Sequence, residues 1–355
     1  MKNIKLYLYK WGITMSYCKR MSQFELLRII LMLFIIGGHI LMWGDSLSNF
    51  KTNSFDYYLS NFLRSIFIIS VNIFVIISGY FGINLKWKKL LKLESRILIY
   101  TYCALLVGIV IGIYNFSLLN DIKLLFPLIT KQYWFITAYF ILCILSPFIN
   151  VFLDNITKRD LQKLIILLFI IFYCVATFCY AINADQIVPD AGYGIVNFIS
   201  LYILGYYLKN YYNDKHNSFF YFCLFFISTI LLFLANIFFT KVFGFYFDSF
   251  ISYNSVFVLL GAINFFLMFK NMNLKYNKSI NMISSRCLAV YIIHMNPILG
   301  KFIFENIFKV KFLTGFDLLL GVTIIPIIVY ISSYIIDFIV DIIMYPIDKY
   351  IFKLK

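Results

Sequence analysis

Long apolar segments constrain this chain more than any other feature, because an α-helix needs about 20 mostly apolar residues to cross a bilayer. The sequence contains ten candidates, at 24–43, 61–83, 97–114, 133–152, 164–183, 194–209, 218–240, 253–270, 287–304 and 314–345. With 62% apolar and only 13% charged residues, the chain has too little polar surface to cover a soluble core. A soluble enzyme, a disordered chain and a nucleic-acid-binding domain are excluded. We expect an all-α integral membrane protein, a bundle of about ten transmembrane helices.

The basic residues predict how these helices are oriented, because Lys and Arg accumulate in short cytoplasmic loops. If the N-terminus is cytoplasmic, the cytoplasmic segments and helix ends carry 22 of the 31 basic residues, the outer segments and outer helix ends carry 8, and Arg28 alone is left in the interior of a span. Both termini are therefore predicted to be cytoplasmic. We expect an N-terminal arm at 1–23, one transmembrane domain at 24–345 and a cytoplasmic tail at 346–355.

Three ionisable residues lie in the first span, where each is costly and therefore indicates a functional site. Glu25 and Arg28 are three apart and share a helix face. Arg28 and His39 are eleven apart, about 20° past three turns, so both project from one stripe about 16 Å apart along the axis. Arg28 suits a phosphate arriving from the cytoplasm, and His39 suits general-base catalysis. The alternative is a structural Glu25–Arg28 pair beside a hydrogen-bonded histidine.

The second span and the loop after it add further polar side chains. Asn72, Ser78 and Tyr80 either line the same cavity as His39 or, for the Ser78-Gly79 pair, allow close helix packing. The loop at 84–96 carries five basic residues that could bind the phosphates of a cytoplasmic cofactor or lipid headgroups. The candidates for phosphate binding there are Lys88, Lys89 and Arg96.

Two later segments place aromatic and histidine side chains in spans. Trp134 lies at the outer edge of the fourth span, as part of an aromatic belt or as a platform for a sugar, and Tyr139 lies deeper. Tyr291 and His294 are three apart and share a helix face.

Other patterns limit the chemistry. Asp337 and Asp341 are four apart late in the final span, where we expect them to mark its inner end rather than a buried carboxylate pair. Seven cysteines without metal-ligand spacing predict neither a disulfide framework nor a metal site. The sequence has no phosphate-binding loop, dinucleotide fingerprint or serine-hydrolase elbow.

Five segments, taken together, resemble a known family. They are Glu25-Leu-Leu-Arg28 with the ten-residue gap to His39, Val71-Asn72 to Ser78-Gly79-Tyr80, Arg96-Ile-Leu-Ile-Tyr100, the run from Tyr133-Trp134 through Tyr139 to Asn150, and Ser285 to Tyr291-Ile-Ile-His294. The pattern is similar to the membrane-bound acyltransferase family three, whose best-known members O-acetylate bacterial surface polysaccharides. The chain departs from that family with Asn72 where Asp is usual and Ala289 where Gly is frequent.

The resemblance implies transfer of an acyl group, most often acetyl, from cytoplasmic acyl-CoA to a hydroxyl of a cell-surface or lipid-linked glycan. The place of action would be the bacterial cytoplasmic membrane, with lipid but no nucleic acid as a partner. On this hypothesis His39 is the general base, with Arg28 and Glu25 on the same stripe. The residues expected at the donor are Arg28, Lys88, Lys89, Arg96 and Ser78. Those expected at the acceptor are Asn72, Tyr80, Trp134, Tyr139, Tyr291 and His294.

Two alternatives stay open, one from another class of protein and one a different enzyme. A flippase or transporter of a lipid-linked sugar would also have an embedded arginine and histidines, although no inverted repeat of interrupted helices is visible in the sequence. A polysaccharide polymerase would also span the membrane many times, although a large outer loop is expected there. The oligomeric state is left open.

Overall fold

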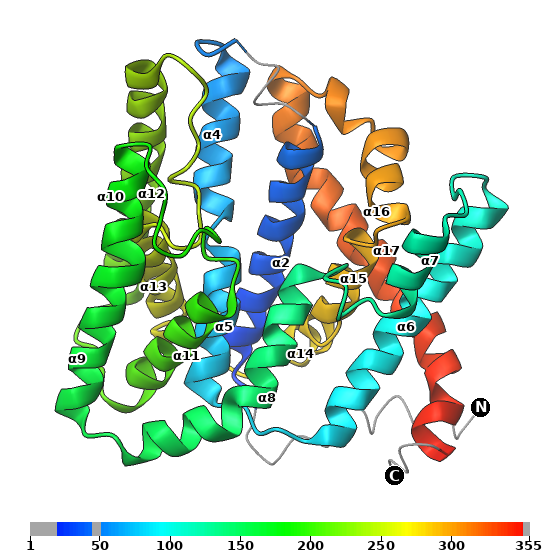
Figure 1. The fold of residues 1–355 in the computed structure, drawn as a ribbon, viewed down its shortest axis with the longest axis horizontal. Helices are drawn as coiled ribbons and strands as arrows, with labels where there is room; N and C mark the ends of the chain where they lie inside the picture. Colours follow the sequence, from blue (N-terminus) through cyan, green and yellow to red (C-terminus); the bar gives the residue numbers. More distant parts are fainter. Residues whose placement is uncertain (1–19, 45–50, 351–355) are drawn as a thin grey trace.

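The computed structural model describes residues 20–44 and 51–350, and this part of the chain contains helices and no strands (Figure 1). Seven helices are long and apolar enough to cross a membrane. They are α2 (Ser22–Trp43), α4 and α5 (Phe55–Phe67 and Ser70–Phe81), α6 (Trp87–Val110), α8 (Trp134–Asn155), α9 to α10 (Lys158–Leu168 and Val175–Ala181, joined by the π-helix η1, Phe169–Cys174), α12 (Ser218–Phe243) and α17 (Gly315–Tyr350). The prediction of an all-α membrane protein is confirmed.

The predicted number of ten full spans is not confirmed. Helix α11 (Ile195–Asn210) has 16 residues and α13 (Val256–Lys270) has 15, so each is about 22–24 Å long against an apolar layer of about 30 Å. The segment predicted at 287–304 is broken by a 90° bend. The bent pair that covers this segment consists of α14 (Lys278–Ser284) and α15 (Cys287–His294) before the bend, and of α16 (Leu299–Phe302) and the π-helix η2 (Ile303–Ile307) after it. Counting this bent pair as one span gives eight.

The two short helices begin inside the bundle because the loops before them descend into it (Figure 1). These loops bond to each other: the Tyr253 N–H donates to the Ala191 carbonyl at 3.0 Å. Asn254 accepts from the Tyr180 hydroxyl at 2.8 Å and donates to Gln186 at 2.9 Å. The loops can therefore replace the missing helical turns without leaving these polar groups unpaired.

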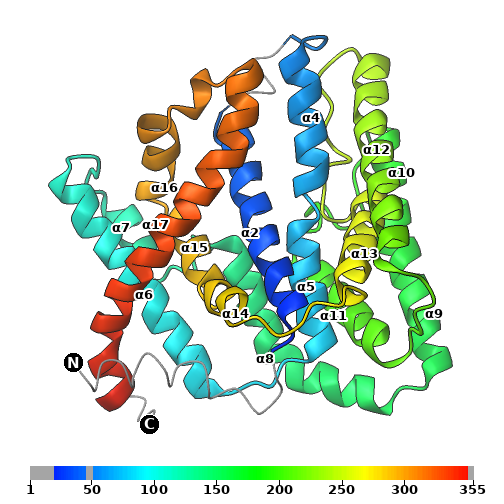
Figure 2. The ribbon, with the colours of Figure 1, turned by 180° about the vertical axis from the view of Figure 1, so that it is seen from behind.

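Helix α2 lies at the centre of the molecule (Figures 1 and 2). Phe24, Leu27 and Leu31, in its first half, pack into a core shared with α5, α8, α11 and α13. Ile36 and Ile40, in its second half, pack into a second core shared with α15 and α17. The polar stripe of α2 is therefore held between two apolar bodies.

The packing of α5 against α11 depends on two glycines. A Cβ atom on Gly79 would lie 2.1 Å from the Tyr202 carbonyl oxygen, and one on Gly205 would lie 2.3 Å from the Ile76 carbonyl oxygen. Any larger residue would force these backbones apart. The small residue in the Ser78-Gly79 pair thus serves close helix packing.

Helices α2, α6 and α9 begin, and α13 and α17 end, at the lower end of the bundle in Figure 1. The start of α2 and the end of α17 thus lie on the same side of the bundle. That this side is cytoplasmic stays a prediction, and residues 1–19 and 351–355 lie outside the described chain. Helix α17 runs obliquely across the bundle, and its 36 residues reach about 54 Å.

Candidate active site

Two histidines that are 255 residues apart in sequence meet in the bundle. His39 in α2 and His294 at the end of α15 are joined by a hydrogen bond of 3.1 Å between Nδ1 and Nε2, respectively. Their ring centroids are 5.2 Å apart. The His294 side chain is fully buried. The sequence predicted both residues as site residues on separate grounds, and the structure brings them together.

The backbone fixes which nitrogen of His294 carries the proton. His294 Nδ1 lies 2.6 Å from the Val290 carbonyl oxygen, one turn earlier in α15. A carbonyl oxygen only accepts, so Nδ1 is the donor and Nε2 of the neutral ring carries the lone pair. His39 Nδ1 must then donate to His294 Nε2. The neutral His39 ring therefore carries its own lone pair on Nε2.

The aromatic residues around this pair restrict the rings and leave one donor available. The Trp43 ring lies 5.5 Å from the His39 ring and packs on Phe304 at 4.6 Å. Tyr291 stands edge-on to His294 with ring centroids 5.8 Å apart. Its hydroxyl is buried and has no hydrogen-bond partner in the described chain.

The bend in the chain directly after His294 is stabilised by Asn296. The Asn296 Oδ1 atom accepts from the N–H groups of Ile298 and Leu299 at 2.9 and 3.1 Å, and its Nδ2 donates to the Tyr133 hydroxyl at 3.1 Å. The interruption therefore ends α15 at His294. Sequence reasoning did not identify Asn296, although Asn followed by Pro is a turn signal.

Glu25 and Arg28 form an ion pair, as the structural alternative for these two residues predicted. Arg28 Nη1 lies 3.0 Å from Glu25 Oε1, and the Arg28 side chain is 34% exposed. The other oxygen of Glu25 accepts from the Ser284 hydroxyl in α14. Ser284 was not predicted, and nothing in the sequence indicated that it would meet residue 25.

A family model described as an acyltransferase domain matches residues 21–340, nearly the whole chain. The chain belongs to acyltransferase family 3. Neither a curated protein nor a solved structure matches it. The resemblance predicted from five segments is confirmed, and the protein is a multi-pass membrane acyltransferase.

A buried charge cluster in this acyltransferase corrects one prediction. Asp337 and Asp341 are not simply the end of the last span, because each binds both Arg96 and Arg286. Arg96 lies 2.5 Å from Asp337 and 2.8 Å from Asp341. The Asp337 side chain is only 2% exposed, and Tyr100 also donates to it. A contact from Arg96 to a donor phosphate stays a prediction.

The hydrogen bonds of Asn72 and Ser78, which were predicted as site residues in the second span, do not involve the histidine pair. Asn72 donates to the Tyr253 carbonyl at 2.8 Å, which holds one of the descending loops. Ser78 donates to the Phe74 carbonyl at 3.0 Å and to the Tyr139 hydroxyl at 3.2 Å. Their roles toward a substrate stay predictions.

The remaining predicted residues lie in different parts of the acyltransferase, and Trp134 does not mark the outer edge of its span, because it packs against the core and the loops that descend into the bundle. Tyr80 packs against Phe24, with ring centroids 5.3 Å apart, near the start of α2. Trp134 packs on Tyr193 at 4.5 Å. Lys88 and Lys89 are exposed in the first turn of α6, at the end of the bundle where α2 begins (Figure 1).

Proposed function

We propose that this acyltransferase moves an acyl group, most readily acetyl, from acyl-CoA to a hydroxyl of a cell-surface or lipid-linked glycan, with His39 as the general base. The observation that carries the proposal is the chain of hydrogen bonds from the Val290 carbonyl through His294 to His39. These hydrogen bonds place the lone pair of the neutral His39 ring on Nε2, and this is the tautomer that a general base needs.

The chemistry requires no group other than a base in the correct tautomer and a donor for the oxyanion. His39 Nε2 takes the proton of a sugar hydroxyl while its oxygen attacks the thioester carbon. The carbon–sulfur bond then breaks, and the imidazolium returns the proton to the leaving thiolate. The products are a glycan ester and CoA. A positioned base contributes about 10²–10⁴-fold to the rate.

Tyr291 is the best candidate for stabilising the oxyanion. Its buried hydroxyl is unpaired within the described chain, and its ring lies 5.8 Å from that of His294. A hydrogen-bond donor of this kind contributes about 2.7–4 kcal/mol when it meets the developing charge. Asn72 and Ser78, which we also predicted to line the site, already donate to the carbonyls of Tyr253 and Phe74.

The donor phosphates would lie at the end of the bundle where α2 and α6 begin. Arg28 keeps part of its guanidinium exposed beside Glu25, and Lys88 and Lys89 are exposed at the start of α6. Arg28 and His39 lie on one stripe of α2, about 16 Å apart along the axis. A pantetheine arm that follows this stripe would bring its thioester toward His39.

The test is acyl transfer in membranes that contain the protein, given radiolabelled acetyl-CoA and candidate glycans. We expect label in the glycan as an alkali-labile ester, at unchanged polymer length by NMR of the purified glycan. Loss of polymer, rather than loss of ester, in cells without the protein would favour a polymerase or a flippase and contradict the proposal.

A further inference from the structure

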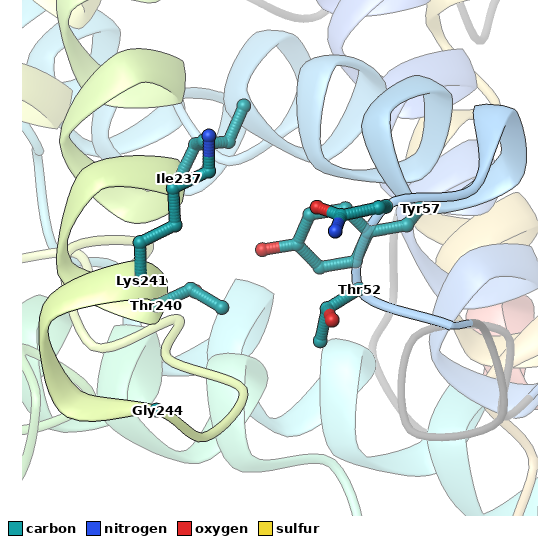
Figure 3. Close-up of a pocket in the computed structure, with 7 residues that line it drawn as sticks. Thr52, Tyr57, Ile237, Thr240, Lys241 and Gly244 are labelled. Carbon is teal, nitrogen blue, oxygen red and sulfur yellow. The ribbon is translucent and has the colours of Figure 1, made fainter.

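A polar cavity of about 310 Å³ lies between the start of α4 and the end of α12, at the opposite end of the bundle from the start of α2 (Figure 3). Small-molecule sites are typically about 300–1,000 Å³, so this one has room for a ligand of about one sugar ring. Its polar lining consists of Thr52, Asn53, Tyr57, Thr240 and Lys241.

Tyr57 is the residue that marks this cavity as a binding site. Its side chain is only 1% exposed, and its hydroxyl makes no hydrogen bond of good geometry in residues 20–44 and 51–350, although the Thr240 hydroxyl is a polar neighbour. The hydroxyl points across the pocket toward α12 (Figure 3). The Thr240 hydroxyl there is engaged with the backbone of Phe247 at 3.2 and 3.3 Å. An unpaired buried hydroxyl costs about 1–3 kcal/mol, which a ligand group would recover.

Further unpaired polar atoms lie beyond the cavity along α4 and α12. Ser60 Oγ and Asn61 Oδ1 lie one turn further along α4, and Asn236 Oδ1 lies one turn before Thr240 in α12. All three atoms are buried and form no hydrogen bond within the described residues. The packed α4–α12 interface next to the cavity is therefore polar.

Lys241 gives the cavity a positive charge. It is exposed in the last turn of α12, and no ion pair is formed by it within the described chain. Asp248, in the loop that follows, is bound by Arg64 at 3.0 Å. An ammonium group that no carboxylate neutralises favours an anion.

We propose that this cavity binds an anionic sugar unit, with its carboxylate or phosphate on Lys241 and its ring hydroxyls on Tyr57, Thr52 and Asn53. The inference rests on the proposed function, because it makes the cavity a subsite that anchors the glycan acceptor away from the donor end. It goes beyond that function by assigning an acidic sugar to the acceptor.

The test is equilibrium binding of three probes to purified His39→Ala protein in nanodiscs, measured by calorimetry. The probes are methyl glucuronide, glucose 1-phosphate and the neutral methyl glucoside, so that the first two distinguish a carboxylate from a phosphate. We expect at least one anionic probe to bind about tenfold more tightly than the neutral one. Lys241→Gln should remove that preference, because charge-assisted hydrogen bonds are about twice as strong as neutral ones.

Two further variants separate the site from general effects of charge and folding. Tyr57→Phe keeps the ring and should weaken the preferred probe about 5–10-fold, since it removes one buried hydrogen bond. Lys123→Gln, which removes an equal charge in α7 (Leu118–Leu125), should change nothing. Equal binding of all three probes, or unchanged binding by both Lys241→Gln and Tyr57→Phe, would overturn the proposal.

The outcome can be read independently of the acyl-transfer assay. The binding measurement uses the His39→Ala variant, so its result does not depend on acyl transfer. Absence of anionic sugar binding in a protein that still acylates glycans would contradict the subsite alone. Binding in a protein that acylates no glycan would support the cavity as an anionic sugar site and contradict its place in acyl transfer.

Discussion

Two groups of ionisable side chains lie at opposite ends of α15, and they are built in opposite ways. Arg286, directly before the helix, belongs to a cluster in which Asp337 and Asp341 each bind two guanidinium groups. His294, at the other end of α15, bonds to Val290 and His39, and this leaves a lone pair on His39 Nε2. In the first group the charges balance and the acceptors are used, whereas the second keeps one acceptor for an incoming proton. A buried charge alone therefore does not identify a site; an unused acceptor does.

The largest expected effect comes from removing that acceptor. His39→Ala should lower glycan acylation by about 10²–10⁴-fold, because Glu25, the other base on the stripe, is bound by Arg28 and Ser284 and lies about 21 Å away along α2. The measurement is transfer of radiolabelled acetyl in membranes with equal amounts of folded protein. His216→Ala is the matched control, since His216 lies exposed in the loop after α11. Normal transfer by a folded His39→Ala protein would disprove the assignment.

The charge-balanced cluster should respond in stability instead. Asp337→Asn leaves the buried Arg96 and Arg286 with one carboxylate between them, and breaking such a network typically costs about 3–5 kcal/mol. The temperature of thermal unfolding in detergent should fall markedly, while the acylation rate per folded molecule should stay near normal. Asp317→Asn, at an exposed position in the first turn of α17, is expected to leave the unfolding temperature unchanged. A large fall in rate without a fall in stability would place this cluster in the catalytic machinery.

This contrast also shows what the sequence could and could not predict. Helical periodicity put Arg28 and His39 on one stripe, and apolar segments located the helices. The partners of Arg96 could not be predicted, because Asp337 lies 241 residues away and no local pattern links them. Residues 253–270 were predicted as a full span, but the helix α13 begins only at Val256. Nothing in the sequence indicates that Tyr253 belongs to a loop that bonds to the distant Ala191 inside the bundle.

The orienting role of His294 predicts a smaller effect of a distinct kind. His294→Leu removes the acceptor for His39 Nδ1, so His39 can adopt the wrong tautomer, and kcat should fall about 10–100-fold with little change in KM. His294→Gln, whose amide oxygen can accept the same proton, should restore part of the rate. A merely structural role would give no such rescue. Equal rates for the Leu and Gln variants would contradict the positioning role.

The smallest predicted effect concerns the Arg28–Glu25 pair. It is charge-balanced like the Arg96 cluster, and like the histidine pair it keeps polar groups available for a substrate. Arg28 is paired with Glu25 like the cluster arginines, yet its side chain is 34% exposed and its guanidinium has further donors. Arg28→Lys keeps the charge but loses the planar fork that can bind a phosphate in a bidentate way beside Glu25, so the KM for acyl-CoA should rise about tenfold while kcat changes little. Arg159→Lys, an exposed position in the first turn of α9, is the matched control and should leave KM unaltered. An unchanged KM in Arg28→Lys, with the protein folded, would mean that Arg28 belongs with the balanced cluster, as a structural partner of Glu25 and Ser284 rather than a ligand for the donor.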